Sequence, residues 1–303
     1  MNLRARIGSV ELPNPVMTAS GTAGHGAELA RSFDLSSIGA VVVKSLSAEP
    51  WAGNPAPRVH QTPAGVLNSV GLQNPGVEAW LEHELPALRA TGARVVASIW
   101  GFTVEAYEKA AAMLAGVEGL VAVEVNVSCP NVEDRRRMFA HSPGPTAEVV
   151  EASAAARLPR WAKLSPNVTD LPEIAGAALG AGAEAVTLIN TLMGMAIDPA
   201  TRRPRLGAGG GGLSGPAIHP VAVRAVHDVH AAFPDAAIVG VGGVASGEDA
   251  VELLLAGARA VQVGTATFAR PKAPAIVLRE LARWCGRHNI STVDELIGAA
   301  HAR

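Results

Sequence analysis

The chain has 303 residues, of which 49% are hydrophobic and 17% are charged, so it can bury a large core and is not intrinsically disordered. Its 25 basic and 27 acidic residues give a formal net charge of −2, which argues against a nucleic-acid or anionic-membrane surface. Aromatic residues make up only 4%, too few for a base-stacking platform.

The cysteine content and the hydropathy pattern limit the metal sites, disulfides and cellular locations that the chain can have. Two cysteines, Cys129 and Cys285, cannot form a four-cysteine zinc or iron–sulfur site within the chain, nor a disulfide scaffold. The first 15 residues lack the apolar core of a signal peptide. No stretch reaches the ~18 uninterrupted apolar residues of a membrane span. We therefore expect a cytoplasmic protein that binds no membrane and no nucleic acid.

Short β-branched runs recur along the chain and predict strands. They are nearly continuous in apolar character, which is typical of a parallel sheet covered on both faces. The eight runs are Val16–Ser20, Val41–Ser45, Val95–Ile99, Val121–Val127, Trp161–Ser165, Ala185–Asn190, Ala237–Val241 and Ala260–Gly264.

Helical stretches with start and stop signals separate these runs. Ser246 with Asp249, and Asp170 with Glu173, have the spacing of capping boxes. Glycine precedes alanine just before several strands, which predicts left-handed helix ends. These glycines are Gly39, Gly92, Gly182 and Gly257. Ser291–Ala300 is expected to form a final capped helix.

Eight strand–helix units predict a single (β/α)₈ TIM barrel over residues 1–303, in preference to a doubly wound open sheet. The connections after strands 2, 4 and 6 are long and rich in turn-formers and polar residues. They contain Trp51–Gly76, Ser128–Thr146 and Thr191–His219. Long structured loops in a barrel usually build the active-site face.

The chemistry of such barrels lies at the carboxyl ends of the strands. Two of these ends carry lysines, Lys44 and Lys163, which favours a shared anionic ligand. The glycine-rich ends of the last two strands, with the helix cap Ser246, favour phosphate binding over ordinary turns. No P-loop motif is present.

The motif EVNVSCPN (Glu124–Asn131) places Cys129 in a polar loop above the predicted barrel mouth, where a thiol can act as acid or base. Cys285 lies in the amphipathic stretch Ile276–Arg287 and is interpreted as a packing residue.

Amide side chains gather on the same face. The motif NSVGLQNPG (Asn68–Gly76) joins Asn126, Asn131 and Asn190. Because an amide both donates and accepts, several amides suit a ring edged with N–H and C=O groups, such as a pyrimidinedione. Asn54 and Asn74 are interpreted as turn-formers. The nine histidines, His25 and His219 among them, show no metal-ligand spacing and are interpreted as structural or solvated.

Together these motifs resemble the catalytic subunit of class 1 dihydroorotate dehydrogenases of the B type. The matching stretches follow family order over nearly the whole chain. They are NPVMTASGT (Asn14–Thr22), VVVKS (Val41–Ser45), NSVGLQNPG, EVNVSCPNV (Glu124–Val132), KLSPNVTD (Lys163–Asp170), LINT (Leu188–Thr191), GGLSGPAIHPVAVR (Gly211–Arg224), VGGV (Val241–Val244) and VGTATF (Val263–Phe268). The membrane-associated class 2 enzymes use serine as base, whereas this chain has Cys129.

The resemblance implies oxidation of (S)-dihydroorotate to orotate in pyrimidine (UMP) biosynthesis, with FMN in the barrel mouth. Cys129 would take a proton from C5 of the substrate, hydride would pass from C6 to the flavin N5, and Lys44 would contact both molecules. The implied substrate-binding residues are Lys44, Asn68, Ser69, Val70, Gly71, Leu72, Asn126, Asn131, Asn190 and Thr191. The implied FMN-binding residues are Ser20, Gly21, Lys44, Ser45, Ser98, Asn126, Lys163, Ile189, Gly215, Gly242, Gly243, Gly264 and Thr265.

Two positions depart from the family pattern. Ser98 stands where the family usually has an asparagine, and Gly207–Gly212 is richer in glycine than usual. The B type also implies a homodimer with a second subunit that carries FAD and a [2Fe–2S] cluster and passes electrons to NAD.

Two other functions stay open at this point. One is a different FMN barrel oxidoreductase that acts on a dihydropyrimidine without the carboxylate. The other is a non-redox barrel enzyme, such as a phosphosugar isomerase or lyase, that binds no flavin.

Overall fold

The computed structural model describes residues 2–128 and 138–302. Its centre is an eight-stranded sheet with the order β3-β16-β15-β10-β9-β8-β7-β4, and every neighbouring pair is parallel. A parallel bridge between Met17 and Ala40 joins the two edges. The strands are β3 (Val16–Thr18), β4 (Val41–Val42), β7 (Val95–Ile99), β8 (Leu120–Asn126), β9 (Arg160–Lys163), β10 (Ala185–Leu188), β15 (Ala237–Val241) and β16 (Ala260–Val263). The predicted (β/α)₈ barrel and its eight strands are confirmed.

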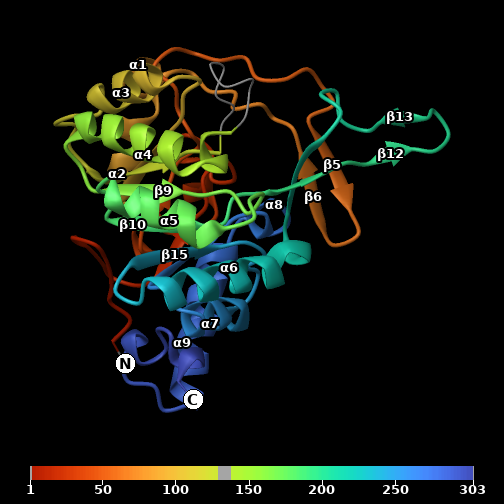
Figure 1. Cartoon of the computed structure of the whole chain (residues 1–303). Helices are drawn as coiled ribbons and strands as arrows, with labels where there is room; N and C mark the ends of the chain where they lie inside the picture. Colours follow the sequence, from red (N-terminus) through yellow and green to blue (C-terminus); the bar gives the residue numbers. More distant parts are fainter. Residues whose placement is uncertain (1, 129–137, 303) are drawn as a thin grey trace.

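Helices surround the sheet (Figure 1). They are α1 (Val77–His83), α2 (Leu85–Ala90), α3 (Val104–Ala112), α4 (Pro143–Ala152), α5 (Leu171–Gly180), α6 (His219–Ala232), α7 (Gly247–Leu255), α8 (Ala266–Ala269) and α9 (Ala273–Arg287). Ser246 and Asp249 form the predicted capping box of α7. The side chain of Asp170 caps α5 by accepting a hydrogen bond from the Glu173 N–H. Of the described helices, none is both long and apolar enough to cross a membrane.

Alternate residues of each strand face two different cores. Val41 and Val123 pack toward the helices, whereas Val42 and Ala122 pack inside the barrel. The interior cluster includes Ile7 of an N-terminal hairpin, β1 (Ala5–Ile7) and β2 (Val10–Leu12). The hairpin therefore closes one end of the barrel with apolar side chains and leaves the opposite end, where the strands finish, for polar groups.

Two of the long connections combine into a second sheet that the sequence pattern did not predict. It is antiparallel, with the order β11-β14-β6-β5. Its strands are β5 (Val59–Thr62), β6 (Gly65–Asn68), β11 (Leu192–Gly194) and β14 (Gly211–Ser214). The pair β12 (Ile197–Asp198) and β13 (Arg203–Pro204) continues from β11 as an arm that extends away from the barrel (Figure 1). This sheet carries Asn68 and Gly212 opposite each other in register.

Two local predictions are wrong. Gly92, Gly182 and Gly257 have the expected positive φ, but Gly39 does not. Gly39 is needed for a close approach instead, because a Cβ there would overlap the backbone oxygen of Asn14. The predicted final helix is also absent: a capping box of Thr292 and Glu295 starts only a 3₁₀ turn, Val293–Glu295, and a second follows at Ala299–His301.

Candidate active site

A chain of hydrogen bonds joins polar side chains at or near the carboxyl ends of four barrel strands, β4, β7, β8 and β10. Ser45 and Ser98 share a hydrogen bond of 2.8 Å between their Oγ atoms. The Asn126 amide donates to Ser45 Oγ at 3.4 Å, and the Asn190 amide donates to Asn126 Oδ1 at 3.0 Å. Ser98, the residue that stands in place of the family's usual asparagine, is fully buried and has its hydroxyl hydrogen-bonded to Ser45. The geometry unites four of the predicted site residues.

The second sheet extends this chain. Asn190 Oδ1 accepts a hydrogen bond from the Thr191 N–H at 2.8 Å. A Cβ on Gly212 would overlap Thr191 Oγ1, so the threonine packs directly on that glycine. The Asn68 amide in turn donates to the Gly212 carbonyl at 3.3 Å. Asn68, Thr191, Asn190 and Asn126 therefore form one continuous polar surface.

The predicted substrate segment Ser69–Leu72 is held from outside by the preceding loop. Asn54 donates to Ser69 Oγ at 2.9 Å, and Trp51 Nε1 donates to the Gly71 carbonyl at 3.0 Å. Leu72 adopts a left-handed conformation with φ 63°. Asn74, which is buried, accepts from the backbone N–H groups of Ser47 and Gly76. Asn54 and Asn74 thus shape turns, as interpreted from the sequence.

Lys44 lies just after β4, half-buried, and its N–H donates to the Gly24 carbonyl at 2.9 Å. The neighbouring His25 escaped the sequence analysis as a site residue. Burial, together with the positive charge of Lys44, lowers the pKa of His25 to about 4. At neutral pH the imidazole beside Lys44 is therefore uncharged.

Lys163 is only 5% exposed and lies beside a buried carboxylate. Its Nζ donates to Ser20 Oγ at 3.1 Å and lies 3.6 Å from Glu124 Oε1. Glu124 Oε2 accepts a hydrogen bond from Gln262 Nε2 at 2.7 Å. Glu124 and Gln262 were not among the predicted site residues, although a polar residue within an otherwise apolar strand indicates a functional contact inside the barrel.

The predicted glycine positions converge on one side of the mouth. Gly215, Gly242 and Gly243 all have positive φ, at 98°, 138° and 74°. A Cβ on Gly242 would lie 2.7 Å from the Ala222 Cβ and 3.6 Å from Ile189. A Cβ on Gly215 would lie 2.9 Å from the Gly65 Cα. Thr265 is next to this turn, and its Oγ1 donates to Ser214 Oγ at 2.8 Å. These turns hold backbone so close to neighbouring atoms that side chains do not fit.

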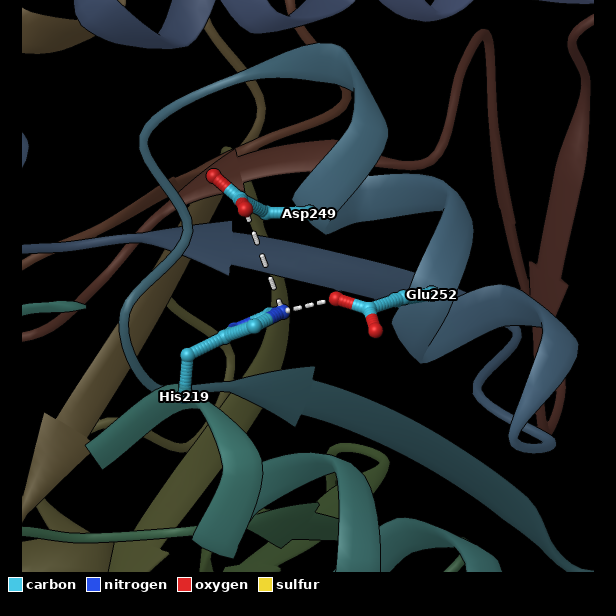
Figure 2. Close-up of side chains that lie close together, drawn as sticks. All are labelled: His219, Asp249 and Glu252. Carbon is cyan, nitrogen blue, oxygen red and sulfur yellow. Dashed lines mark hydrogen bonds and ion pairs between the residues drawn. The ribbon is translucent and has the colours of Figure 1, made fainter. Parts of the chain in front are cut away.

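His219 fixes the Gly242–Gly243 turn from the start of α6. Its Nδ1 is 2.8 Å from the Gly242 carbonyl, and its Nε2 is 2.9 Å from Glu252 Oε2 and 4.0 Å from Asp249 Oδ1 (Figure 2). The three side chains have the donor atoms of a cation site. Through these contacts the imidazole ties the turn after β15 to α7.

Four backbone N–H groups around the N-terminus of α7 already donate to side chains, which leaves fewer of them for the phosphate that Ser246 predicted. Asp249 Oδ2 accepts from the N–H groups of Ala245 and Ser246. Gly247 N–H donates to Glu280, and Asp249 N–H donates to Ser246 Oγ. An anion on this side would meet the preceding glycine turn instead.

Two predicted residues, Cys129 and Asn131, lie outside the described residues. The segment that leads to them starts at Asn126, whose Oδ1 accepts from the Ser128 N–H at 3.3 Å. Cys285 is fully buried on α9, and burial raises the pKa of its thiol. The packing interpretation of Cys285 is confirmed.

Comparison with known proteins decides the family. A family model described as dihydroorotate dehydrogenase matches residues 2–284. The chain belongs to the dihydroorotate dehydrogenase family. It is 52% identical over 296 residues, which is 97% of this chain and 96% of the relative, to a protein of Desulforudis audaxviator named dihydroorotate dehydrogenase B (NAD(+)), catalytic subunit. Relatives of the same name from Geobacter sp. strain M21 and Citrifermentans bemidjiense are each 48% identical over 299 residues, 98% of both chains. The chain is accordingly an oxidoreductase.

Proposed function

We propose that the chain oxidises (S)-dihydroorotate to orotate, the redox step of pyrimidine (UMP) biosynthesis, with FMN as cofactor in one barrel spanning residues 1–303. The observation that carries this proposal is the continuous polar surface beside two strand-end lysines. That surface is formed by Asn68, Thr191, Asn190 and Asn126. Amides pair with the N–H and C=O edges of a dihydropyrimidine ring, and a lysine pairs with its carboxylate.

The described residues fit FMN. Tight glycine turns at Gly215, Gly242 and Gly243 present backbone rather than side chains, as a phosphate requires. Gly264 packs on Ala19, and Gly21 has positive φ with open space where a Cβ would be. Lys163 supplies a buried cation for the pyrimidine edge of the ring. We assign the FMN contacts to the thirteen positions inferred from the family resemblance.

When bound, FMN supplies a hydride acceptor for C6 of the substrate. The chain's own residues bind and orient the ring through the continuous polar surface and Lys44. Cys129 takes the proton from C5, because a thiolate is a competent base at neutral pH when its surroundings favour ionisation. Asn131 and residues Ser69–Leu72 complete the substrate pocket. His25, uncharged beside Lys44, adds no competing positive charge.

We infer that electrons leave through a partner. The names of the relatives specify NAD(+) and a catalytic subunit, which imply a second subunit. FAD and a [2Fe–2S] cluster are assigned to that subunit, because two cysteines cannot hold the cluster. A homodimer is supported by apolar side chains on and beside the extended arm: Met193, Met195 and Ile197 are 56–57% exposed. The two cysteines favour a cytoplasmic setting.

Substrate comparison tests this proposal against a related dihydropyrimidine oxidoreductase. The holoenzyme is assayed with an artificial electron acceptor and either dihydroorotate or dihydrouracil. We expect turnover with dihydroorotate and little with dihydrouracil, which lacks the carboxylate that Lys44 binds. Preference for dihydrouracil would assign the chain to the alternative function.

A further inference from the structure

Glu124 and Lys163 form a buried ion pair beneath the barrel mouth. Glu124 lies on β8 and Lys163 on β9, and their side chains are 0% and 6% exposed. Of the lysine and arginine ion pairs within residues 2–128 and 138–302, it is the only one with both side chains buried. Placing two charges in a core is costly, so the pair calls for a reason other than stability.

The surrounding hydrogen bonds orient the Glu124 carboxylate toward Lys163 and the Lys163 amine toward the barrel mouth. Gln262 on β16 donates to Glu124 Oε2, which turns Oε1 toward the Lys163 amine. Apart from that ion pair, Oε1 has no hydrogen bond within the described residues. The amine in turn donates to Ser20 Oγ, after the end of β3. The line Gln262–Glu124–Lys163–Ser20 thus runs from inside the barrel to a strand end at its mouth.

We propose that Glu124, oriented by Gln262, is a positioning residue that holds the Lys163 amine in place and aimed at the mouth, and thereby sets how strongly the site prefers reduced over oxidised FMN. This inference rests on the proposed function, because FMN is the group that Lys163 faces. A buried ammonium that loses its counter-charge moves toward water. That movement takes the cation away from the place where reduction of the ring builds up negative charge.

The test is the midpoint potential of bound FMN at one fixed pH, measured against a reference dye. In Glu124→Gln the ratio of reduced to oxidised FMN affinity should fall on the order of tenfold, which is about 30 mV for this two-electron couple. Glu124→Asp keeps the charge and should stay close to wild type. The matched control is Glu49→Gln, which makes the same change in the exposed pair of Glu49 and Lys109 and should leave the potential unchanged.

A double variant keeps the proposal testable if Glu124→Gln does not fold. Exchanging the two residues, as Glu124→Gln with Gln262→Glu, keeps one buried carboxylate and its amide partner but moves the charge off the residue that faces Lys163. We expect a lowered potential in this variant too. A wild-type potential in a folded Glu124→Gln or exchange variant, or a higher one, would overturn the proposal. A wild-type chain that binds no FMN would instead refute the proposed function.

Discussion

The two lysines at the barrel mouth have different electrostatic surroundings. Lys163 is buried and paired with a carboxylate, whereas Lys44 is half-buried beside an imidazole that stays uncharged at neutral pH. A fixed, paired cation suits a resident cofactor. A more open cation suits a substrate that comes and goes. Lys163 is therefore expected to serve FMN alone, whereas Lys44 is expected to reach the substrate as well as FMN.

Cys129 is the residue on which the proposed proton transfer depends. In Cys129→Ser we expect FMN retention and orotate binding, but flavin reduction by dihydroorotate about 10²–10⁴-fold slower, because a serine hydroxyl is a much poorer base than a thiolate. Anaerobic stopped-flow mixing measures this half-reaction without the electron acceptor. Cys285→Ser is the control and should show wild-type kinetics, since that thiol is buried on α9. A wild-type rate in Cys129→Ser would exclude Cys129 as the base.

His25 predicts a pH dependence of stability. Its pKa is about 4 in the folded chain and about 6.5 when unfolded, so the unfolded state binds the proton first as the pH falls. The free energy of unfolding, relative to His25→Gln, should be constant above about pH 6.5 and should fall toward pH 4. Denaturant unfolding of both proteins across this range measures the difference. His230, whose pKa is also lowered by burial, is present in both proteins and cancels. Parallel pH profiles would contradict the half-buried, uncharged state of His25.

At the scale of elements, the antiparallel sheet β11-β14-β6-β5 joins two long connections into one wall of the site. Its cross-strand pairing sets Asn68 of β6 against Gly212 of β14, and Gly212 supports Thr191. This explains why glycine occupies position 212: the strand must pass close to the threonine. The glycine-rich segment Gly207–Gly212 thus leads into the strand that packs against Thr191.

Gly212→Ala tests that wall. The added methyl overlaps Thr191 Oγ1, so we expect Thr191 to shift and kcat/KM for dihydroorotate to drop on the order of tenfold or more, with FMN retained. The control is Gly180→Ala at the end of α5, where a Cβ meets nothing within 4 Å. That change should leave activity intact and stability unchanged or slightly higher. Equal kinetics for the two variants would show that Thr191 does not hold the substrate.

Sequence patterns predict the barrel but not its second sheet. Apolar strand runs alternate with capped helices along the chain, and the residues that signal each strand or helix lie within that element. The sheet β11-β14-β6-β5 pairs residues nearly 150 positions apart, such as Asn68 with Gly212, and short strands of glycine and turn-formers carry no such local period. The same limit applies to the site. Strand-end residues such as Lys163 and Asn126 could be predicted, whereas Glu124 and His25 gain their roles from neighbours brought together by folding.

At the scale of the whole molecule, the catalytic chain is expected to depend on a partner for its final electron acceptor. The purified chain with FMN should reduce artificial acceptors when given dihydroorotate but should not reduce NAD. Added electron-transfer subunit should restore NAD reduction, followed as NADH absorbance. Rapid NAD reduction by the isolated chain would contradict the assignment of FAD and the iron–sulfur cluster to a second subunit.

The most direct test of the proposed function is an anaerobic visible titration of the purified chain with dihydroorotate. We predict a yellow protein with one FMN per chain, whose flavin absorbance bleaches on addition of dihydroorotate and returns when an electron acceptor is added. Dihydrouracil should leave the spectrum unchanged. A colourless protein that takes up no FMN on reconstitution, or a bound flavin that stays oxidised with dihydroorotate, would contradict the proposed function.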